Sequence, residues 1–238
     1  MSSSRLPGKV MKLLSGKPVI EHIFDRLYKA QKLDDIVLAT SIDESDNLLE
    51  KFSKTKSYKC YRGSLEDVLS RFYCAARFYK ADIIVRITGD CPVIDPKIID
   101  ELIDFFISGN YDYASLWGEF PDGLDSSIMS YATLESAYKN AQLKSEREHV
   151  CPYIENRPDH FLIGKYIKFK NQGHHRWTLD EKEDFLFLEK IFNSLYISNP
   201  DFDYDDIFKL LERNKMLTKI NNHIIRNEGY AQSLEEDE

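Results

Sequence analysis

Asp82-Ile-Ile-Val-Arg-Ile-Thr-Gly-Asp-Cys-Pro-Val-Ile-Asp-Pro96 contains the strand and the turn that decide the fold. Its β-branched run predicts a buried strand that ends at Gly89, and Pro92 keeps the following loop from becoming a helix. A single carboxylate at the carboxyl end of a buried strand is where α/β sheets bind ligands. A carboxylate is also a natural ligand for Mg²⁺ that carries a phosphate. Asp90 is therefore either a metal ligand or a turn residue that caps the next helix.

The segments on both sides of this strand alternate between strands and amphipathic helices. Strands are expected at residues 36–39, 58–61, 111–116, 127–130 and 161–169. Apolar residues at helical spacing follow residues 18, 45, 64 and 96, and recur over residues 132–142, 147–155, 181–195 and 204–213. Strands that alternate with helices predict an α/β fold in three α/β/α layers, with a mostly parallel, doubly wound sheet.

Composition excludes several classes of protein. The chain has 238 residues, of which 42% are hydrophobic, which suits one large domain or one domain with an appendage. A net charge of −8 argues against a general nucleic-acid binder. No run reaches the ~18 apolar residues of a membrane span, and no secretory signal opens the chain. The four cysteines are scattered, which predicts reduced thiols in the cytoplasm and neither a disulfide frame nor a zinc site.

The first 20 residues are basic in an otherwise acidic chain. They contain Arg5, Lys9, Lys12 and Lys17 and no acid. Pro7 and Gly8 indicate a loop, whose backbone N–H groups can face a phosphate while the basic side chains supply charge. The loop lacks the G-x-x-x-x-G-K-[ST] pattern of a Walker loop. The segment is therefore a candidate anion site, and the alternative is a solvated basic stretch.

Several motifs occur in a fixed order and together resemble one family. They are Arg5-Leu-Pro-Gly-Lys9, Gly16-Lys-Pro18, Arg62-Gly-Ser-Leu-Glu-Asp-Val-Leu69, Arg86-Ile-Thr-Gly-Asp-Cys-Pro-Val-Ile-Asp-Pro96, Pro121-Asp-Gly-Leu-Asp125, Arg147-Glu-His-Val-Cys-Pro-Tyr153 and Arg176-Trp-Thr-Leu-Asp180. The chain resembles the cytidylyltransferases of the acylneuraminate/Kdo-activating superfamily, and within it the SpsF-type branch of spore coat polysaccharide biosynthesis. The resemblance covers nearly the whole chain.

The resemblance implies a glycosyltransferase-A-like nucleotidyltransferase fold. It implies a cytidylyltransferase domain over residues 1–198 and a C-terminal helical extension with an acidic tail over residues 199–238. The implied reaction moves CMP from CTP to a hydroxyl of an acidic sugar of the nonulosonic-acid type, with Mg²⁺ and with release of pyrophosphate. A cytoplasmic homodimer that serves surface polysaccharide or glycan biosynthesis, without nucleic-acid or membrane partners, is also implied.

Site residues are carried over from the resemblance position by position. Catalytic roles fall on Arg5, Lys9 and Asp90, and metal binding falls on Asp90 and Asp180. The implied nucleotide-binding residues are Ser4, Arg5, Lys9, Lys17, Arg62, Ser64 and Arg86. The implied sugar-binding residues are Asp122, Asp125, Glu148 and His149. This division suits the chemistry, because attack on the α-phosphorus builds up charge that cations and Mg²⁺ can stabilise.

The chain departs from the family at its start. The family has an apolar strand and a basic residue just before the position of Met1, so we expect a sheet that lacks its first, central strand. A late start codon or a trimmed chain would explain this departure, and a structurally compromised protein is the other explanation. Two alternative functions stay open, namely a glycosyltransferase of the same fold that uses a nucleotide-sugar donor and a non-catalytic nucleotide- or sugar-binding module. A dinucleotide dehydrogenase is disfavoured, because no G-x-G-x-x-G follows a strand.

Overall fold

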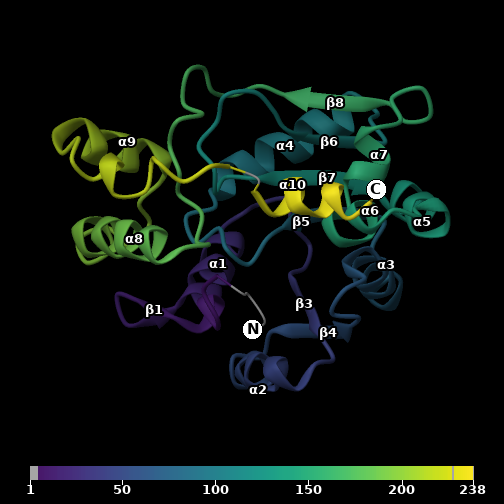
Figure 1. The fold of residues 1–238 in the computed structure, drawn as a ribbon, viewed down its shortest axis with the longest axis horizontal. Helices are drawn as coiled ribbons and strands as arrows, with labels where there is room; N and C mark the ends of the chain where they lie inside the picture. The colour runs from purple at the N-terminus through teal and green to yellow at the C-terminus, as the bar shows by residue number, and fades with distance from the viewer. Residues whose placement is uncertain (1–4, 227, 238) are drawn as a thin grey trace.

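The main sheet has four strands and carries the candidate residue Asp90 just beyond one of them. The computed structural model describes residues 5–226 and 228–237. The strand order is β5 (Ile83–Ile87), β7 (Ser126–Ser130), β6 (Tyr113–Leu116) and β8 (Ile163–Tyr166) (Figure 1). β7 is antiparallel to β5 and β6, and β6 is parallel to β8. Three of the four strands therefore run in one direction.

A second, smaller sheet lies apart from the main one. β3 (Val37–Ser41) pairs with β4 (Lys59–Gly63) in parallel, and within the described residues neither strand pairs with β5. β5 has one unpaired edge in this part of the chain, and Ile83 is 42% exposed. This is the interruption of the sheet that we expected. The sequence did not predict the short hairpin of β1 (Leu13–Leu14) and β2 (Lys17–Pro18).

Two hydrophobic clusters cover opposite faces of the main sheet. Neighbouring residues of a strand point to opposite faces, so Ala114 and Ile128 belong to one cluster and Tyr113 and Met129 to the other. The first cluster includes α1 (Val19–Leu27), α4 (Pro96–Ser108), α8 (Lys182–Leu195) and α9 (Tyr204–Arg213). The second includes α3 (Val68–Tyr79), α5 (Tyr131–Asn140) and α7 (Pro152–Glu155), and α6 (Lys144–His149) contacts α3 and α7 beside it. The predicted three-layer α/β/α architecture is confirmed.

The remaining short elements border the two sheets. α2 (Asn47–Thr55) contacts the small sheet, and the 3₁₀ turns are η1 (Lys9–Met11), η2 (Glu44–Asp46) and η3 (Thr218–Ile220). No helix in the described part of the chain is long and apolar enough to cross a membrane.

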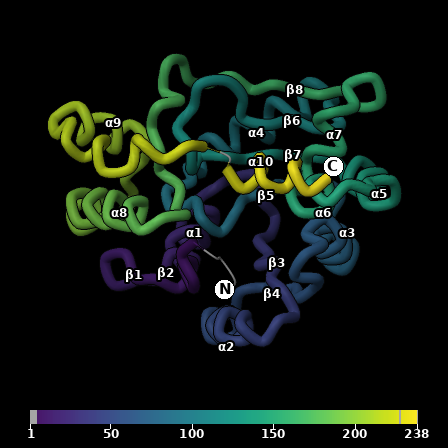
Figure 2. Tube along the Cα trace, viewed as in Figure 1, coloured from purple at the N-terminus to yellow at the C-terminus, as the bar shows by residue number. Residues whose placement is uncertain are grey.

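The C-terminal segment returns across the molecule after α9. Figure 2 shows the chain leaving α9 and leading to α10 (Glu228–Glu235), which contacts α6. Phe202, Ile207 and Leu211 are buried in the same cluster as α1 and α8. The division into a domain and an extension at residue 198 stays a prediction, although the first part of that extension shares a core with the rest of the chain.

Candidate active site

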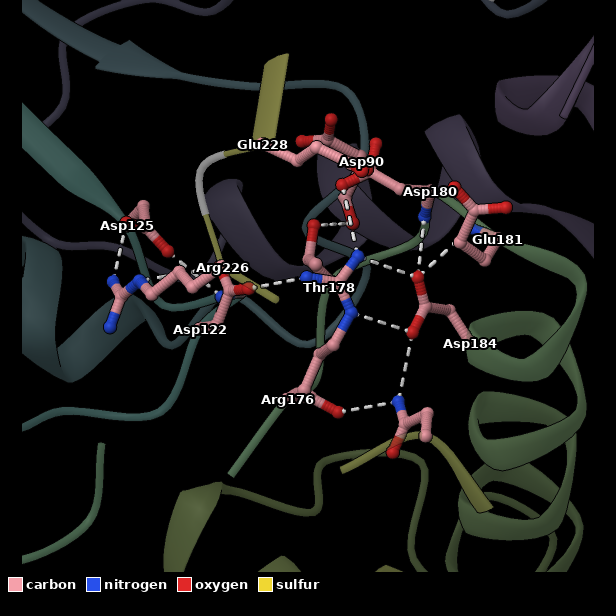
Figure 3. A network of polar contacts seen from close by, with 12 residues as sticks. Asp90, Asp122, Asp125, Arg176, Thr178, Asp180, Glu181, Asp184, Arg226 and Glu228 are labelled. Carbon is pink, nitrogen blue, oxygen red and sulfur yellow. Dashed lines mark hydrogen bonds and ion pairs between the residues drawn. The ribbon is translucent and has the colours of Figure 1, made fainter. Parts of the chain in front are cut away.

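Asp90 and Asp180 meet at the amino group of Lys9. Lys9 Nζ donates to Asp90 Oδ2 at 2.8 Å and to Asp180 Oδ1 at 2.8 Å. Figure 3 shows these two aspartates within the wider network of polar contacts. Burial acts to lower the pKa of Lys9, but the charges of the two aspartates outweigh it and raise that pKa. Burial likewise acts to raise the pKa of Asp90, and the charge of Lys9 reverses that effect, so the pKa is lowered. The ionised form of Asp90 is therefore favoured, and both aspartates contact one cation.

The two carboxylates fit a divalent cation with a small protein ligand set. Two aspartate oxygens, each 2.8 Å from Lys9 Nζ, converge on the same point. Mg²⁺ prefers such hard oxygen donors and commonly keeps several waters and substrate phosphates beside one or two carboxylates. No group of three or more His, Cys, Asp or Glu residues that could hold a metal occurs in the described ranges. Asp90 and Asp180 are thus the residues that would hold Mg²⁺.

Arg5 also contacts this cluster of charged residues. Its guanidinium is 3.3 Å from Asp180 Oδ1, 3.4 Å from Glu181 Oε1 and 3.3 Å from Glu228 Oε2. Arg5, Lys9, Asp90 and Asp180 are therefore brought together, as the sequence predicted. The candidate Ser4 lies outside the described residues.

The backbone around Asp180 is held by a buried network that the sequence did not predict. Arg176 donates from Nη1 to Asp122 at 2.9 Å, and from Nε and Nη2 to Asp184 at 2.9 Å each. Asp184 also accepts from the backbone N–H groups of Asp180 and Glu181 and from Asn221 Nδ2, all at 2.9 Å. Burial opposes the charge of Asp184, but these donors lower its pKa. Arg176 and Asp180 precede α8, so helical spacing gave no signal for this network.

Asp122 and Asp125 lie in a loop that packs directly on the segment before Asp180. Gly123 has φ 103°, and a Cβ there would lie 2.5 Å from the carbonyl carbon of Trp177, so only glycine fits. Arg226 donates to Asp125 Oδ1 at 2.8 Å and lies 3.8 Å from Asp122 Oδ1. Burial and then the charge of Asp125 raise the pKa of Asp122 to about 7, although Arg226 and Arg176 partly oppose them.

Glu148 and His149 lie on α6 and contact the C-terminal helix. Ser233 donates to Glu148 Oε2 at 3.0 Å, and its hydroxyl is 3.0 Å from His149 Nε2. The ring of Tyr230 meets His149 edge-on at 5.1 Å. The C-terminal segment therefore contacts all four residues expected on the sugar side, through Arg226 for the two aspartates and through α10 for Glu148 and His149. It is a part of the site that the motifs did not assign.

The other predicted nucleotide-binding residues have different surroundings. Lys17 donates to Asp25 at 2.7 Å, and this hydrogen bond raises its pKa. Arg62 donates to the carbonyl of Ser41 and to Glu50 at 2.8 Å each, so it joins β3, β4 and α2. Ser64 accepts from the backbone N–H of Asp67 at 3.0 Å. The side chain of Arg86 forms no hydrogen bond or ion pair among the described residues. Its guanidinium carbon lies 5.9 Å from the ring centre of Phe72.

Two known proteins are similar in sequence to this chain, and one of them is described as a cytidylyltransferase. The spore coat polysaccharide biosynthesis protein SpsF of Bacillus subtilis is 28% identical and spans 90% of this chain and 91% of its own. The 3-deoxy-manno-octulosonate cytidylyltransferase 2 of Hydrogenovibrio crunogenus is 34% identical over 46% of this chain and 45% of its own.

A solved structure and a family model extend this similarity to the whole fold. The structure of a cytidylyltransferase from Leptospira borgpetersenii superposes with a TM-score of 0.87 at 30% identity, over 95% of each chain. The model of the family described as cytidylyltransferase matches residues 1–222, which include Lys9, Asp90, Asp180 and the loop of Asp122. The chain belongs to the cytidylyltransferase family.

Proposed function

We propose that this chain transfers CMP from CTP to a hydroxyl of an acidic sugar and releases pyrophosphate. The observation that carries the proposal is the convergence of Asp90 and Asp180 on Lys9 at the carboxyl end of β5. The acidic sugar is supported by the relative named for 3-deoxy-manno-octulosonate. The proposal includes Mg²⁺ and a cytoplasmic homodimer. It also includes a place in surface polysaccharide or glycan biosynthesis, and the similarity to SpsF supports this last part.

The residues of the site divide the electrostatic work of the reaction. The acceptor oxygen forms a bond to the α-phosphorus of CTP while the bond to the bridging oxygen of pyrophosphate breaks. Lys9 and Arg5 lie where they can bind phosphate oxygens, because both already contact the carboxylate of Asp180. Asp90 and Asp180 would hold Mg²⁺, which when bound neutralises charge on the phosphates. The buried hydrogen bonds of Asp184 to the amides of Asp180 and Glu181 orient that side of the site.

The test measures pyrophosphate release from CTP and Mg²⁺ with a panel of acidic sugars. The panel contains 3-deoxy-manno-octulosonate, N-acetylneuraminate and further nonulosonic acids, with glucose as the neutral control. We expect release with at least one acid and none with glucose. Asp90→Asn should lose at least about 100-fold in kcat, which is the usual cost of one lost electrostatic stabiliser. The exposed Asp34→Asn is the matched control, and silence across the panel would reject the proposal.

A further inference from the structure

Arg86 and Arg71 face a part of the molecule that is separate from the Lys9 cluster. In β5, Val85 and Ile87 pack against the core of α1 and α4, whereas Ile84 packs against the core under α3. Because side chains alternate along a strand, Arg86 lies on the α3 face. There its guanidinium lies 5.9 Å from the ring of Phe72, the residue after Arg71 in α3.

Neither arginine is neutralised in the described part of the chain. Nε of Arg86 is buried and lacks a hydrogen-bond partner, and no ion pair of this residue occurs there. Nε of Arg71 is buried without a partner too, and among the described residues the Arg71 side chain donates to the carbonyls of Ser64 at 2.7 Å and Leu65 at 3.4 Å. Both arginines are half-buried, and a buried guanidinium nitrogen without a partner is costly. The two unpartnered nitrogens therefore indicate a site for an anion.

The acids that act on Arg71 are occupied elsewhere. Burial lowers the pKa of Arg71, Asp46 opposes this, and the positive charge of Arg86 lowers the pKa further. Asp46 accepts hydrogen bonds from Thr40 at 2.6 Å and from Ser41 at 2.7 Å. Asp67 forms an ion pair with Arg147. The two arginines therefore repel one another, and no carboxylate makes an ion pair with either of them in the described residues.

The surroundings of the pair belong to the sugar side of the site. Arg86 is opposite Ser127 in the register of β5 and β7, and Ser127 Oγ lies 3.4 Å from Cys151 Sγ. Burial lowers the pKa of His149. The charge of Glu148 opposes this effect, and the charge of Arg86 adds to it. Arg86 thus lies within electrostatic range of His149. The resemblance implied a place near the nucleotide for Arg86, but its neighbours on this face include His149, an expected sugar-side residue.

We propose that Arg71 and Arg86 together bind the carboxylate of the acceptor sugar. This inference rests on the proposed function. The triphosphate can be bound by Lys9 and Arg5. Arg176 and Arg226 already pair with the expected sugar-side residues Asp122 and Asp125, so they are not free to bind a carboxylate. Two guanidinium groups supply the charge and the forked hydrogen bonds that a carboxylate matches.

The test compares three acids with their neutral methyl esters, without CTP, by titration calorimetry. The probes are glucuronate, 3-deoxy-manno-octulosonate and N-acetylneuraminate. At least one acid should bind the wild type about tenfold or more tightly than its ester, the effect of one charge-assisted hydrogen bond. Arg86→Met and Arg71→Met should abolish this preference, whereas Arg77→Met, an exposed control on the same helix, should keep it. Arg86→Lys, which retains charge without the fork, should keep part of it.

Far-UV circular dichroism shows whether each variant is folded. Affinity for CTP with Mg²⁺ is measured separately, and it should stay unchanged if the two arginines bind the acid. A preference for the acid that survives in Arg86→Met, or a failure of all three acids to bind the wild type, would overturn the proposal. Loss of CTP affinity in a folded Arg86→Met would assign the arginine to the nucleotide and overturn it as well. Pyrophosphate release distinguishes this proposal from the proposed function. If the wild type binds an acid selectively but releases no pyrophosphate, the proposed function alone is rejected. If Arg86→Met turns over with an unchanged KM for the acid, the arginine site alone is rejected.

Discussion

Arg176 is buried and Arg71 and Arg86 are half-buried, and their charges are compensated differently. Arg176 contacts Asp122, Asp180 and Asp184, and its guanidinium nitrogens are all used. Arg71 and Arg86 each keep a buried Nε without a partner in the described residues. A neutralised arginine holds the backbone in place, whereas an arginine without a counter-ion is available to a ligand. The difference separates residues that build the site from residues that recognise what enters it.

Removal of the acid at the centre of the neutralised network should have the largest effect. Asp184→Asn leaves Arg176 with a buried and partly uncompensated charge, so the free energy of unfolding should fall by about 3–5 kcal/mol. Urea unfolding followed by circular dichroism measures this change. Glu183→Gln, an exposed neighbour on α8, should change the value by less than about 0.5 kcal/mol. An equally small effect of Asp184→Asn would mean that the network is not structural.

The cation that joins Asp90 to Asp180 should matter for turnover more than for folding. Lys9→Met should lower kcat about 100- to 1,000-fold, the usual cost of one electrostatic stabiliser. Steady-state pyrophosphate release measures the loss, with the exposed Lys51→Met as the control. Since Lys9 separates two carboxylates, a variant that unfolds would instead give Lys9 a structural role.

The same network predicts a dependence of stability on pH. The pKa of Asp184 is lowered from 3.8 in the folded chain, so the unfolded chain binds its proton first as the pH falls. The stabilisation is therefore fully present above 3.8 and is lost as the pH falls through the folded pKa. As the pH is lowered from 6 to 3, the free energy of unfolding should fall less steeply in Asp184→Asn than in the wild type. Parallel curves for the two proteins would contradict the assignment.

Replacing an arginine without a counter-ion should change the free energy of unfolding least, and in the direction opposite to Asp184→Asn. Arg86→Met removes a buried donor that lacks a partner, so the free energy of unfolding should rise by about 1 kcal/mol. The same urea titration measures it, and Arg77→Met again serves as the control. A fall as large as that of Asp184→Asn would remove the distinction between the two kinds of arginine.

The sequence predicted the parts of the site that local patterns report. The strand before Asp90 follows from its β-branched run, and the meeting of Asp90, Asp180 and Lys9 was expected from the ordered motifs. The role of Asp184 was missed because its partner Asn221 is 37 residues further along the chain. Such a contact depends on how α8 and η3 pack, which no local pattern reports.

Helix ends and the chain end show the same limit. Apolar spacing predicted a helix after residue 64, but α3 begins at Val68, where Asp67 accepts from the N–H of Ser70 at 2.9 Å. Ser64 instead accepts from Asp67 N in the preceding turn. The expected helical extension includes α10, which ends at Glu235, where the acidic tail begins. Tyr230 and Ser233 of this helix contact His149 of α6, and no local pattern reported that contact.

The segment from Trp177 to Leu179 works as a fixed spacer. Trp177 donates its N–H to the carbonyl of Asp122 at 2.6 Å, and Leu179 donates its N–H to the carbonyl of Asp90 at 2.9 Å. One extended stretch therefore sets the separation between Asp90 and the loop of Asp122, and the tight approach of Gly123 prevents that loop from sliding. A substitution that lengthens or shortens this stretch would move both loops at once, because each is joined to it by a backbone hydrogen bond.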